Sequence, residues 1–348
     1  MLQHQLRSIL KSAHAQFLCM MRPVRTLFRE RIFVPCVRIL ALLSIGAMLG
    51  LLTMTQGIPK AFASQTRPPA DWSFYMNSAS TSTAYTFGCD QGKADASFSP
   101  PLNSEVVLDF GGQFSDGSGT LMINGVSITN SQIASVTESF AQGYWDCTGN
   151  DSTSVMHLGI GTSNSYYDVS YAGGQAWVNE VAAIQSAIKT KGWASQIAML
   201  GADDLEPGFG DAPSAISWAQ GFASVSGYLY LNYGSTDGCP QYSTGNGSCN
   251  NGWNQYDVWY VSWGSPPAEP APEIYYYAQA QQWAMISLYG AQSQSSQGAV
   301  LMQGPWDEYD LDSSTLTSAQ AWDALWTDLN NNSATAQSMP YAMEIQQE

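Results

Sequence analysis

The chain has 348 residues, a formal net charge of −16 and 45% hydrophobic residues, which allows one large globular domain or two small ones. Without residues 1–63, four basic residues remain against 27 acidic ones, a net charge of −23. This excess argues against nucleic-acid binding, which needs a basic surface. It suits an extracellular protein in an acidic medium, where protonated carboxylates repel one another less.

The N-terminal part has the pattern of an export signal. Seven of the twelve basic residues lie within the first 38 positions, an uncharged apolar run covers Ile39–Thr55, and Ala61-Phe62-Ala63 follows. We expect a signal peptide over 1–63 and a secreted, extracellular or cell-surface protein. A start at Met20 or Met21 would give a leader of more usual length. The alternative is an uncleaved anchor, since the uncharged run is just long enough to span a membrane. Membrane contact is expected only through such an uncleaved leader.

Four cysteines remain after the leader, an even number that fits an exported, disulfide-bonded chain. Three pairings are possible, and we favour Cys239–Cys249, which would close a Gly/Asn-rich loop, and Cys89–Cys147. Zinc binding is the poorer alternative because the spacings are wrong and His157 is the only histidine left. No metal site and no cofactor is expected.

Residues 64–81 are polar and Pro-rich, and we expect a linker there. Residues 82–348 alternate expected strands with expected helices. The expected strands are Ala84–Asp90, Glu105–Gly111, Ser154–Thr162, a run from Ile197, Gly227–Tyr233, Tyr256–Trp263, Ala299–Gly304 and Tyr341–Ile345. A hairpin with an Asn-Gly turn is expected over Leu121–Ile128.

Helices are expected near Ser131–Trp145 and Gly174–Lys191, from Asp211 onward, around Trp283, and over Trp322–Leu329. This alternation predicts an irregular (β/α)8 barrel of the TIM type, forming a single domain after the signal peptide. The alternative is an open doubly wound sheet, although no G-x-G-x-x-G follows an early strand.

The stretch IAMLGADDLEPGFG, residues 197–210, carries the main candidate chemistry. Asp204 and Glu206 lie two apart and would share one face of a strand, while Asp203 takes the other. Carboxyl groups at this spacing fall in the broad range that glycosidases use. A barrel places its active site at the carboxyl ends of its strands, and residues suited to sugar binding gather there. These are Asp90, Asp109, Asn232, Tyr233, Trp263, Gln303, Trp306 and Asp307.

Three short motifs resemble the layout of the family 25 glycoside-hydrolase muramidases: Gly88-Cys89-Asp90, the Asp204–Glu206 pair, and the aromatic run VWYVSW within 256–263. The resemblance covers roughly 82–348 and implies a barrel that acts on a cell-wall polysaccharide. It departs at the second expected strand, where VVLDFGG replaces the family's K-A-T-E-G-like segment. The chain is also similar to secreted actinobacterial-type proteins of unassigned function, which share a D-D-[IL]-E-P stretch and a T-A-Q-S-x-P-Y tail.

The sequence therefore predicts a glycoside hydrolase acting on peptidoglycan or another polysaccharide. Glu206 is the expected general acid, with its pKa raised by burial or by Asp204. Asp204 would stabilise developing positive charge or orient a substrate N-acetyl group, and Asp90 or Asp109 would assist. The alternative is a non-catalytic glycan- or cell-wall-binding barrel. Two further alternatives are weaker. Calcium binding by the acidic loop 307–312 fits no EF-hand spacing, and a Ser-His-Asp hydrolase would need His157, which has no G-x-S-x-G nearby.

Overall fold

The structure, a computed structural model, describes residues 65–348 except 150, 152, 166–168, 243–244, 266 and 295–296. The expected leader, residues 1–63, lies outside the described residues. Of the helices that the structure describes, none is long and apolar enough to cross a membrane.

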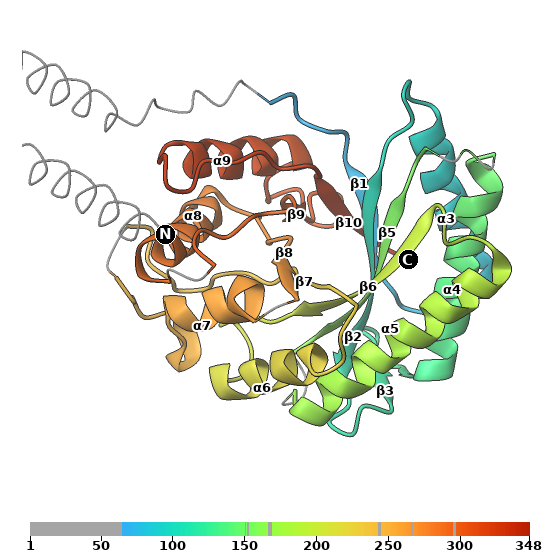
Figure 1. Cartoon of the computed structure of the whole chain (residues 1–348), viewed down its shortest axis with the longest axis horizontal. Coiled ribbons are helices and arrows are strands. Elements are labelled where there is room, and N and C mark those ends of the chain that lie inside the picture. The colour runs from blue at the N-terminus through green and yellow to red at the C-terminus, as the bar shows by residue number, and fades with distance from the viewer. Residues whose placement is uncertain are drawn as a thin grey trace, which may run out of the picture. The chain divides into compact units, whose positions relative to one another are not determined.

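Eight parallel strands form a curled sheet at the centre of the described chain (Figure 1). Their order is β8-β7-β6-β5-β2-β1-β10-β9. A hairpin of β3 and β4 continues antiparallel from the end of β2. The strand bounds are β1 Asp71–Tyr75, β2 Ser104–Gln113, β3 Gly119–Leu121, β4 Ser127–Thr129, β5 Met156–Ser163, β6 Ile197–Asp204, β7 Tyr230–Asn232, β8 Ala268–Pro270, β9 Trp306–Asp307 and β10 Met343–Gln347.

The curl brings the first and last strands together, so that Asp71 of β1 pairs with Met343 of β10. The two ends of the strand order, β8 and β9, are linked just beyond β8. There Glu273 forms a parallel bridge with Trp306, and the Trp306 amide donates to the Pro272 carbonyl at 2.8 Å. The predicted α/β class is thus confirmed, with a parallel sheet curled as a half-barrel.

Helices follow the strands along the chain. In Figure 1, α3 and α4 lie to the right of the strands, α5 at the lower right, α6 below them, α7 and α8 on the left, and α9 above β8 and β9. Their bounds are α3 Thr81–Ala96, α4 Asn130–Cys147, α5 Tyr171–Lys191, α6 Ala212–Ala223, α7 Gln255–Trp259, α8 Tyr277–Ser293 and α9 Ser318–Asn330. Two short turns, η1 Asn250–Gly252 and η2 Tyr260–Gly264, flank α7. The helix starts carry the expected caps, as at Asp211, whose side chain accepts from the Ser214 amide at 2.7 Å.

Alternating side chains separate two hydrophobic cores on the two faces of the sheet. The larger core lies between the sheet and the helices and includes Leu108 and Ile160. The smaller core fills the concave side and includes Val107, Leu200 and Trp306. Tyr233 stacks on Trp306 there, with ring centroids 4.5 Å apart. Residues of the concave face at the strand ends therefore point into the space that the sheet encloses.

The prediction of Ala84–Asp90 as the first strand is wrong, because this segment lies within α3. Its true counterpart, β1, lies inside residues 64–81, so the linker prediction is also wrong for Asp71–Tyr75. α3 contains β-favouring residues and two glycines, and packing stabilises it more than propensity does. A Cβ at Gly88 would lie 2.0 Å from the Phe140 carbonyl oxygen of α4, so only glycine permits this close helix contact.

The prediction of Tyr256–Trp263 as a strand is also wrong, because these residues form α7 and η2. Asn254 caps α7 through a capping box with Asp257, and this local signal overrides the aromatic, β-favouring composition. The corresponding strand, β8, lies in the Pro-rich segment that follows and ends at Pro270. It lies at one end of the strand order, where proline is tolerated.

Candidate functional site

A cleft opens at the carboxyl ends of the strands. Tyr75 of β1 pairs with Asp109 of β2, and both line a hollow of about 410 Å³ together with Asp204 of β6. A second hollow of about 340 Å³ shares Tyr75, Asp204, Phe209 and Glu308 with the first. The two hollows are therefore parts of one cleft, which we call the acidic cleft.

Carboxylates dominate the polar lining of the acidic cleft. The sequence predicted Asp109, Asp204 and Glu206 as site residues, and the structure brings all three to it. Three more carboxylates that the sequence did not indicate line the cleft: Asp237, Glu273 and Glu308. Among the described residues, no Lys, Arg or His lines either hollow.

Asp204, like Glu308, lines both hollows of the acidic cleft. It ends β6 and is 9% exposed, and its Oδ1 atom has no hydrogen-bond partner among the described residues. Burial raises the pKa of Asp204 well above its usual value, and the negative charges of Glu206 and Glu273 raise it further. The neutral, protonated form of Asp204 is therefore favoured.

Glu206 follows β6 in a loop and is 5% exposed. Its Oε2 atom accepts from the backbone amide of Ser235 at 2.7 Å. Burial raises the pKa of Glu206, but this hydrogen bond opposes the shift because it stabilises the anion. Gly234, next to Ser235, leaves room for the pair, since a Cβ there would lie 2.9 Å from Asp204 Oδ1.

Glu273 lies three residues after β8, lines the same hollow as Asp204 and Glu206, and is 7% exposed. Burial raises its pKa well above the usual value and Glu206 adds to the effect, while a hydrogen bond with the Tyr275 side chain lowers it. Asp109 lies at the other end of the cleft, where burial raises its pKa to about 6 against the opposing hydrogen bond from the Gly111 amide. The pKa values of the carboxyl groups of Asp204, Glu206, Glu273 and Asp109 are thus all raised by burial in the cleft.

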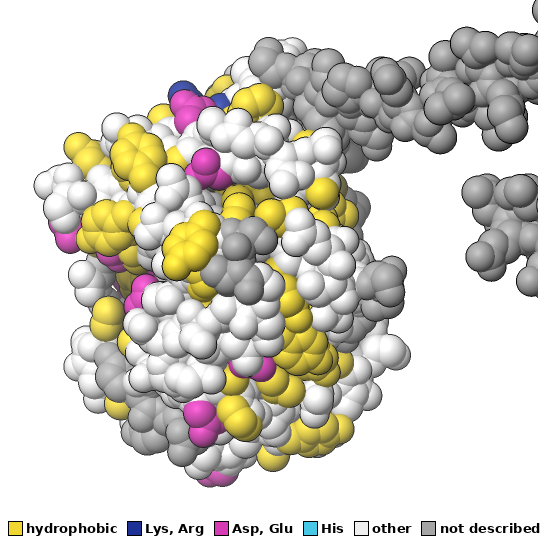
Figure 2. All heavy atoms as spheres, turned by 90° about the vertical axis from the view of Figure 1, so that its left-hand side faces the viewer, with side chains coloured by type: hydrophobic (Ala, Val, Ile, Leu, Met, Phe, Trp, Pro, Cys, Tyr) yellow, Lys and Arg dark blue, Asp and Glu magenta, His cyan; other side chains and the backbone are white. Residues whose placement is uncertain are grey.

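An apolar rim surrounds these carboxylates. Ile123 is 49% exposed, Tyr276 50%, Leu311 41% and Phe209 37%, and all four line the cleft. On the face that Figure 2 shows, hydrophobic side chains (yellow) and acidic ones (magenta) are spread widely, and basic ones (dark blue) appear only near the top. Exposed aromatic and aliphatic groups beside buried polar ones are typical of sites that bind the apolar faces and hydroxyls of sugars.

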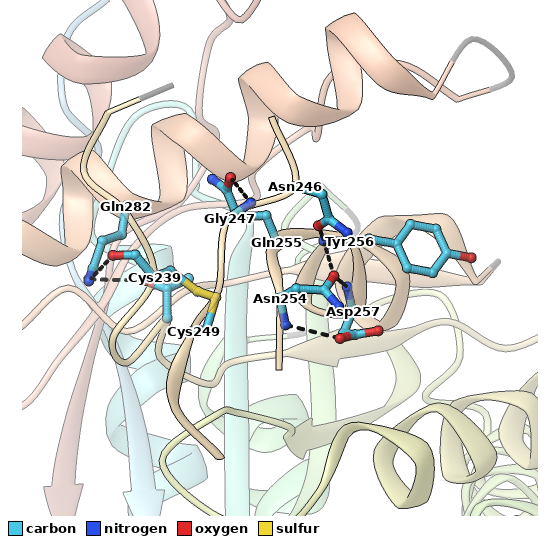
Figure 3. The surroundings of a disulfide bond; sticks show 10 residues. Cys239, Asn246, Gly247, Cys249, Asn254, Gln255, Tyr256, Asp257 and Gln282 are labelled. Atoms are coloured by element: carbon cyan, nitrogen blue, oxygen red, sulfur yellow. Dashed lines mark hydrogen bonds between the residues drawn. A yellow bond between two sulfur atoms is a disulfide. The ribbon is translucent and has the colours of Figure 1, made fainter. Parts of the chain in front are cut away.

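The Cys239–Cys249 disulfide stabilises the loop behind the cleft (Figure 3). Gln282 of α8 donates to the Cys239 carbonyl at 2.8 Å, and the Tyr256 amide donates to Asn246 Oδ1 at 2.8 Å. The same loop reaches the acidic stretch, because Asn251 Nδ2 donates to the Pro207 carbonyl at 2.8 Å. The disulfide loop therefore positions the backbone that carries Glu206.

The second disulfide, Cys89–Cys147, joins α3 to α4. Both expected pairings are confirmed. The Cys89–Cys147 disulfide lies in the contact between these two helices, and neither of its cysteines is among the residues that line the acidic cleft.

Several predicted site residues lie elsewhere. Asp90 is exposed on α3, where it pairs with Lys93 at 3.0 Å, because the strand expected there is a helix. Trp263 belongs to η2 and donates to the Gln297 carbonyl at 3.4 Å, since the expected sixth strand is helical. Gln303 precedes β9 and lies near the amino ends of the strands, where it donates to Glu269 Oε2 at 2.6 Å beside His157. These three residues do not join the carboxylates at the cleft.

The remaining predicted residues support the site from within the fold. The Asn232 side chain is fully buried and bonds both the amide and the carbonyl of Leu205 at 3.1 Å, next to Glu206. Tyr233 and Trp306 form the stacked pair of the concave core, below the cleft. Asp307 is fully buried next to Trp306, on the opposite face of β9, and burial raises its pKa to about 7.

A sequence signal for Glu273 exists but is weak. Glu269, Ala271 and Glu273 alternate with proline and alanine at a period of two, which is the spacing of one face of a strand. The prolines in the segment hide this pattern.

Comparisons of this chain with protein-family models, with curated proteins and with solved structures found no match.

Proposed function

We propose that this chain is an exported glycoside hydrolase whose carboxylates in the acidic cleft cleave a polysaccharide. The observation that carries the proposal is the buried pair Asp204 and Glu206, which lines a cleft with Glu273 and with exposed apolar side chains. Glycoside hydrolysis needs one protonated carboxyl group and one ionised carboxylate on either side of the bond. Burial and mutual repulsion separate the pKa values of such groups.

The sequence favours Glu206 as the acid, but the contacts favour the reverse assignment. Glu206 receives a backbone hydrogen bond that stabilises its charge, whereas Asp204 Oδ1 receives none and faces two other carboxylates. We therefore assign the proton to Asp204, which would donate it to the glycosidic oxygen as the bond to the anomeric carbon breaks. Glu206 would then stabilise the positive charge that develops on the sugar ring, and a water molecule would complete the hydrolysis by adding to the anomeric carbon and returning a proton to Asp204.

Two finer features belong to the same proposal. The bridge between Glu273 and Trp306 supports an irregular (β/α)8 barrel, closed between β8 and β9. Two disulfides favour folding outside the cytoplasm, as the predicted leader requires.

The test measures the release of reducing ends from peptidoglycan, chitin oligomers and plant glycans at about pH 4–5, near the ordinary carboxyl pKa. Asp204→Asn and Glu206→Gln should each lower the rate by about 100-fold or more, the usual range for removing an acid or base. Asp146→Asn, a charge change on α4 outside the cleft, serves as the matched control. Equal turnover by wild type and Asp204→Asn would remove Asp204 from the mechanism.

The apolar rim also favours a second candidate, a glycan-binding protein without catalysis. Its exposed aromatic and aliphatic side chains would bind a sugar even if the carboxylates served only structure. Binding without turnover, unchanged in Glu206→Gln, would favour this candidate over the hydrolase.

A further inference from the structure

We propose that the acidic cleft selects sugars with free amino groups, and that its ligand is a polymer of deacetylated, glucosamine-type residues. The inference rests on the proposed function and names the substrate class of that site. It starts from the charge of the lining, in which six carboxylates are present and no cationic side chain among the described residues opposes them.

The four basic residues in the described part of the chain are all engaged or distant. Arg67 pairs with Asp323 at 3.1 Å, Lys93 with Asp90, and Lys191 with Glu138 at 2.6 Å. Lys189 lines a different hollow, near the amino ends of the strands. An anionic sugar in the acidic cleft would therefore find no counter-charge there.

A second observation, independent of the charge count, points to a bound donor. Asp204 is nine-tenths buried and lines both hollows, and its carboxyl group has no hydrogen-bond partner among the described residues. Native structures rarely leave a buried carboxylate oxygen unpaired, so a donor from a ligand is the natural complement. An ammonium group supplies three donors and a positive charge.

The surroundings of Asp204 favour a charged donor over a hydroxyl. Glu206 and Glu273 both act on Asp204 electrostatically and disfavour its ionised form. A cation beside Asp204 would offset the negative charges of Glu206 and Glu273, whereas a neutral acetamido group would not. The apolar rim residues, such as Tyr276 and Phe209, would contact the faces of the sugar rings and leave the amino groups directed at the carboxylates.

The test compares three tetrasaccharides by calorimetry with the full chain: glucosamine, N-acetylglucosamine and galacturonic acid. The measurement is made near pH 6, where a carboxylate of ordinary pKa is ionised, at low and at high salt. The glucosamine tetramer should bind at least tenfold tighter than the neutral tetramer at low salt, with the difference shrinking at high salt. The galacturonate tetramer should bind weakest.

Two variants locate the effect. Asp237→Asn and Glu308→Gln each remove a charge from the cleft lining and should weaken glucosamine binding several-fold more than N-acetylglucosamine binding. Asp146→Asn, with the same charge change on α4, should alter neither.

Equal affinity for the cationic and neutral tetramers, or equal weakening of both by the cleft variants, overturns the amino-sugar proposal. The proposed hydrolase stands in that case if the neutral tetramer is cleaved. If none of the three sugars binds or is cleaved, both proposals fail.

Discussion

The two disulfides should separate stability from function. The Cys89–Cys147 bond joins residues that are 58 positions apart in the sequence, and the Cys239–Cys249 bond joins residues that are 10 positions apart. The loop-entropy relation then gives about 4 kcal/mol and about 3 kcal/mol of lost stability when each is replaced by a serine pair. On stability alone, the helix-joining disulfide should matter more.

For function at the acidic cleft we expect the reverse order, with the Cys239–Cys249 disulfide mattering more than the Cys89–Cys147 disulfide. Asp237 of the cleft lies two residues before Cys239, and Asn251, two residues after Cys249, donates from its side chain to the Pro207 carbonyl beside Glu206. The Cys89–Cys147 bond joins α3 and α4, away from this loop. We expect Cys239→Ser/Cys249→Ser to lower glycan hydrolysis or binding at least tenfold, and Cys89→Ser/Cys147→Ser to leave it near the wild-type value at a temperature where both fold.

The assay pairs urea denaturation of each double variant with its rate on the best substrate at low temperature. Circular dichroism confirms that each variant is folded under the assay conditions. The reasoning is refuted if the helix-joining variant loses function to the same extent, or if the loop variant keeps full function despite its lower stability. Either result would mean that the loop does not position Glu206.

Two further predictions concern single residues of the cleft. In Gly234→Ala the new methyl group would lie 2.9 Å from Asp204 Oδ1 and from the Leu205 carbonyl oxygen, so these groups must shift. We expect the rate of hydrolysis to fall at least tenfold although the carboxylates of Asp204 and Glu206 are still present. An unchanged rate would contradict the assigned geometry. Asp109 has a pKa raised from 3.8 to about 6, so the stability it contributes is present below about pH 4 and is lost as the pH rises through about 6. Asp109→Asn should remove this loss, so its free energy of unfolding relative to that of the wild type should rise by about 3 kcal/mol between pH 4 and pH 7, as measured by urea denaturation. If the variant and the wild type differ in free energy of unfolding by the same amount at both pH values, the carboxyl group does not titrate as described.

The sequence predicted the elements in which periodicity and caps agree. α5 is an example, because Trp177, Val181, Ile184 and Ile188 share its buried face and Gly192 ends it at φ 82°. The acidic end of β6 was also predictable, since an apolar run leads directly into it. In such segments the local pattern and the tertiary environment require the same structure.

The errors fall where tertiary contacts override local preference. β1 lies in a segment rich in proline and polar residues, and its sheet partners β2 and β10 determine its conformation. α3 resembles a strand in composition, but its glycines and the Cys89–Cys147 bond fit it against α4. Because β8 was not recognised, Glu273 was missed, and half of the carboxylates in the cleft were missed with the loops that carry them.

The pairing of β1 with β10 also bears on how the chain folds. Asp71 cannot complete its sheet contacts until Met343 has been synthesised, because these two residues are partners in the ladder. Contacts of such wide sequence separation slow folding. Met343 and Ile345 of the last strand also belong to the concave core, so a chain emerging from the ribosome completes this core only after its final residues have been made.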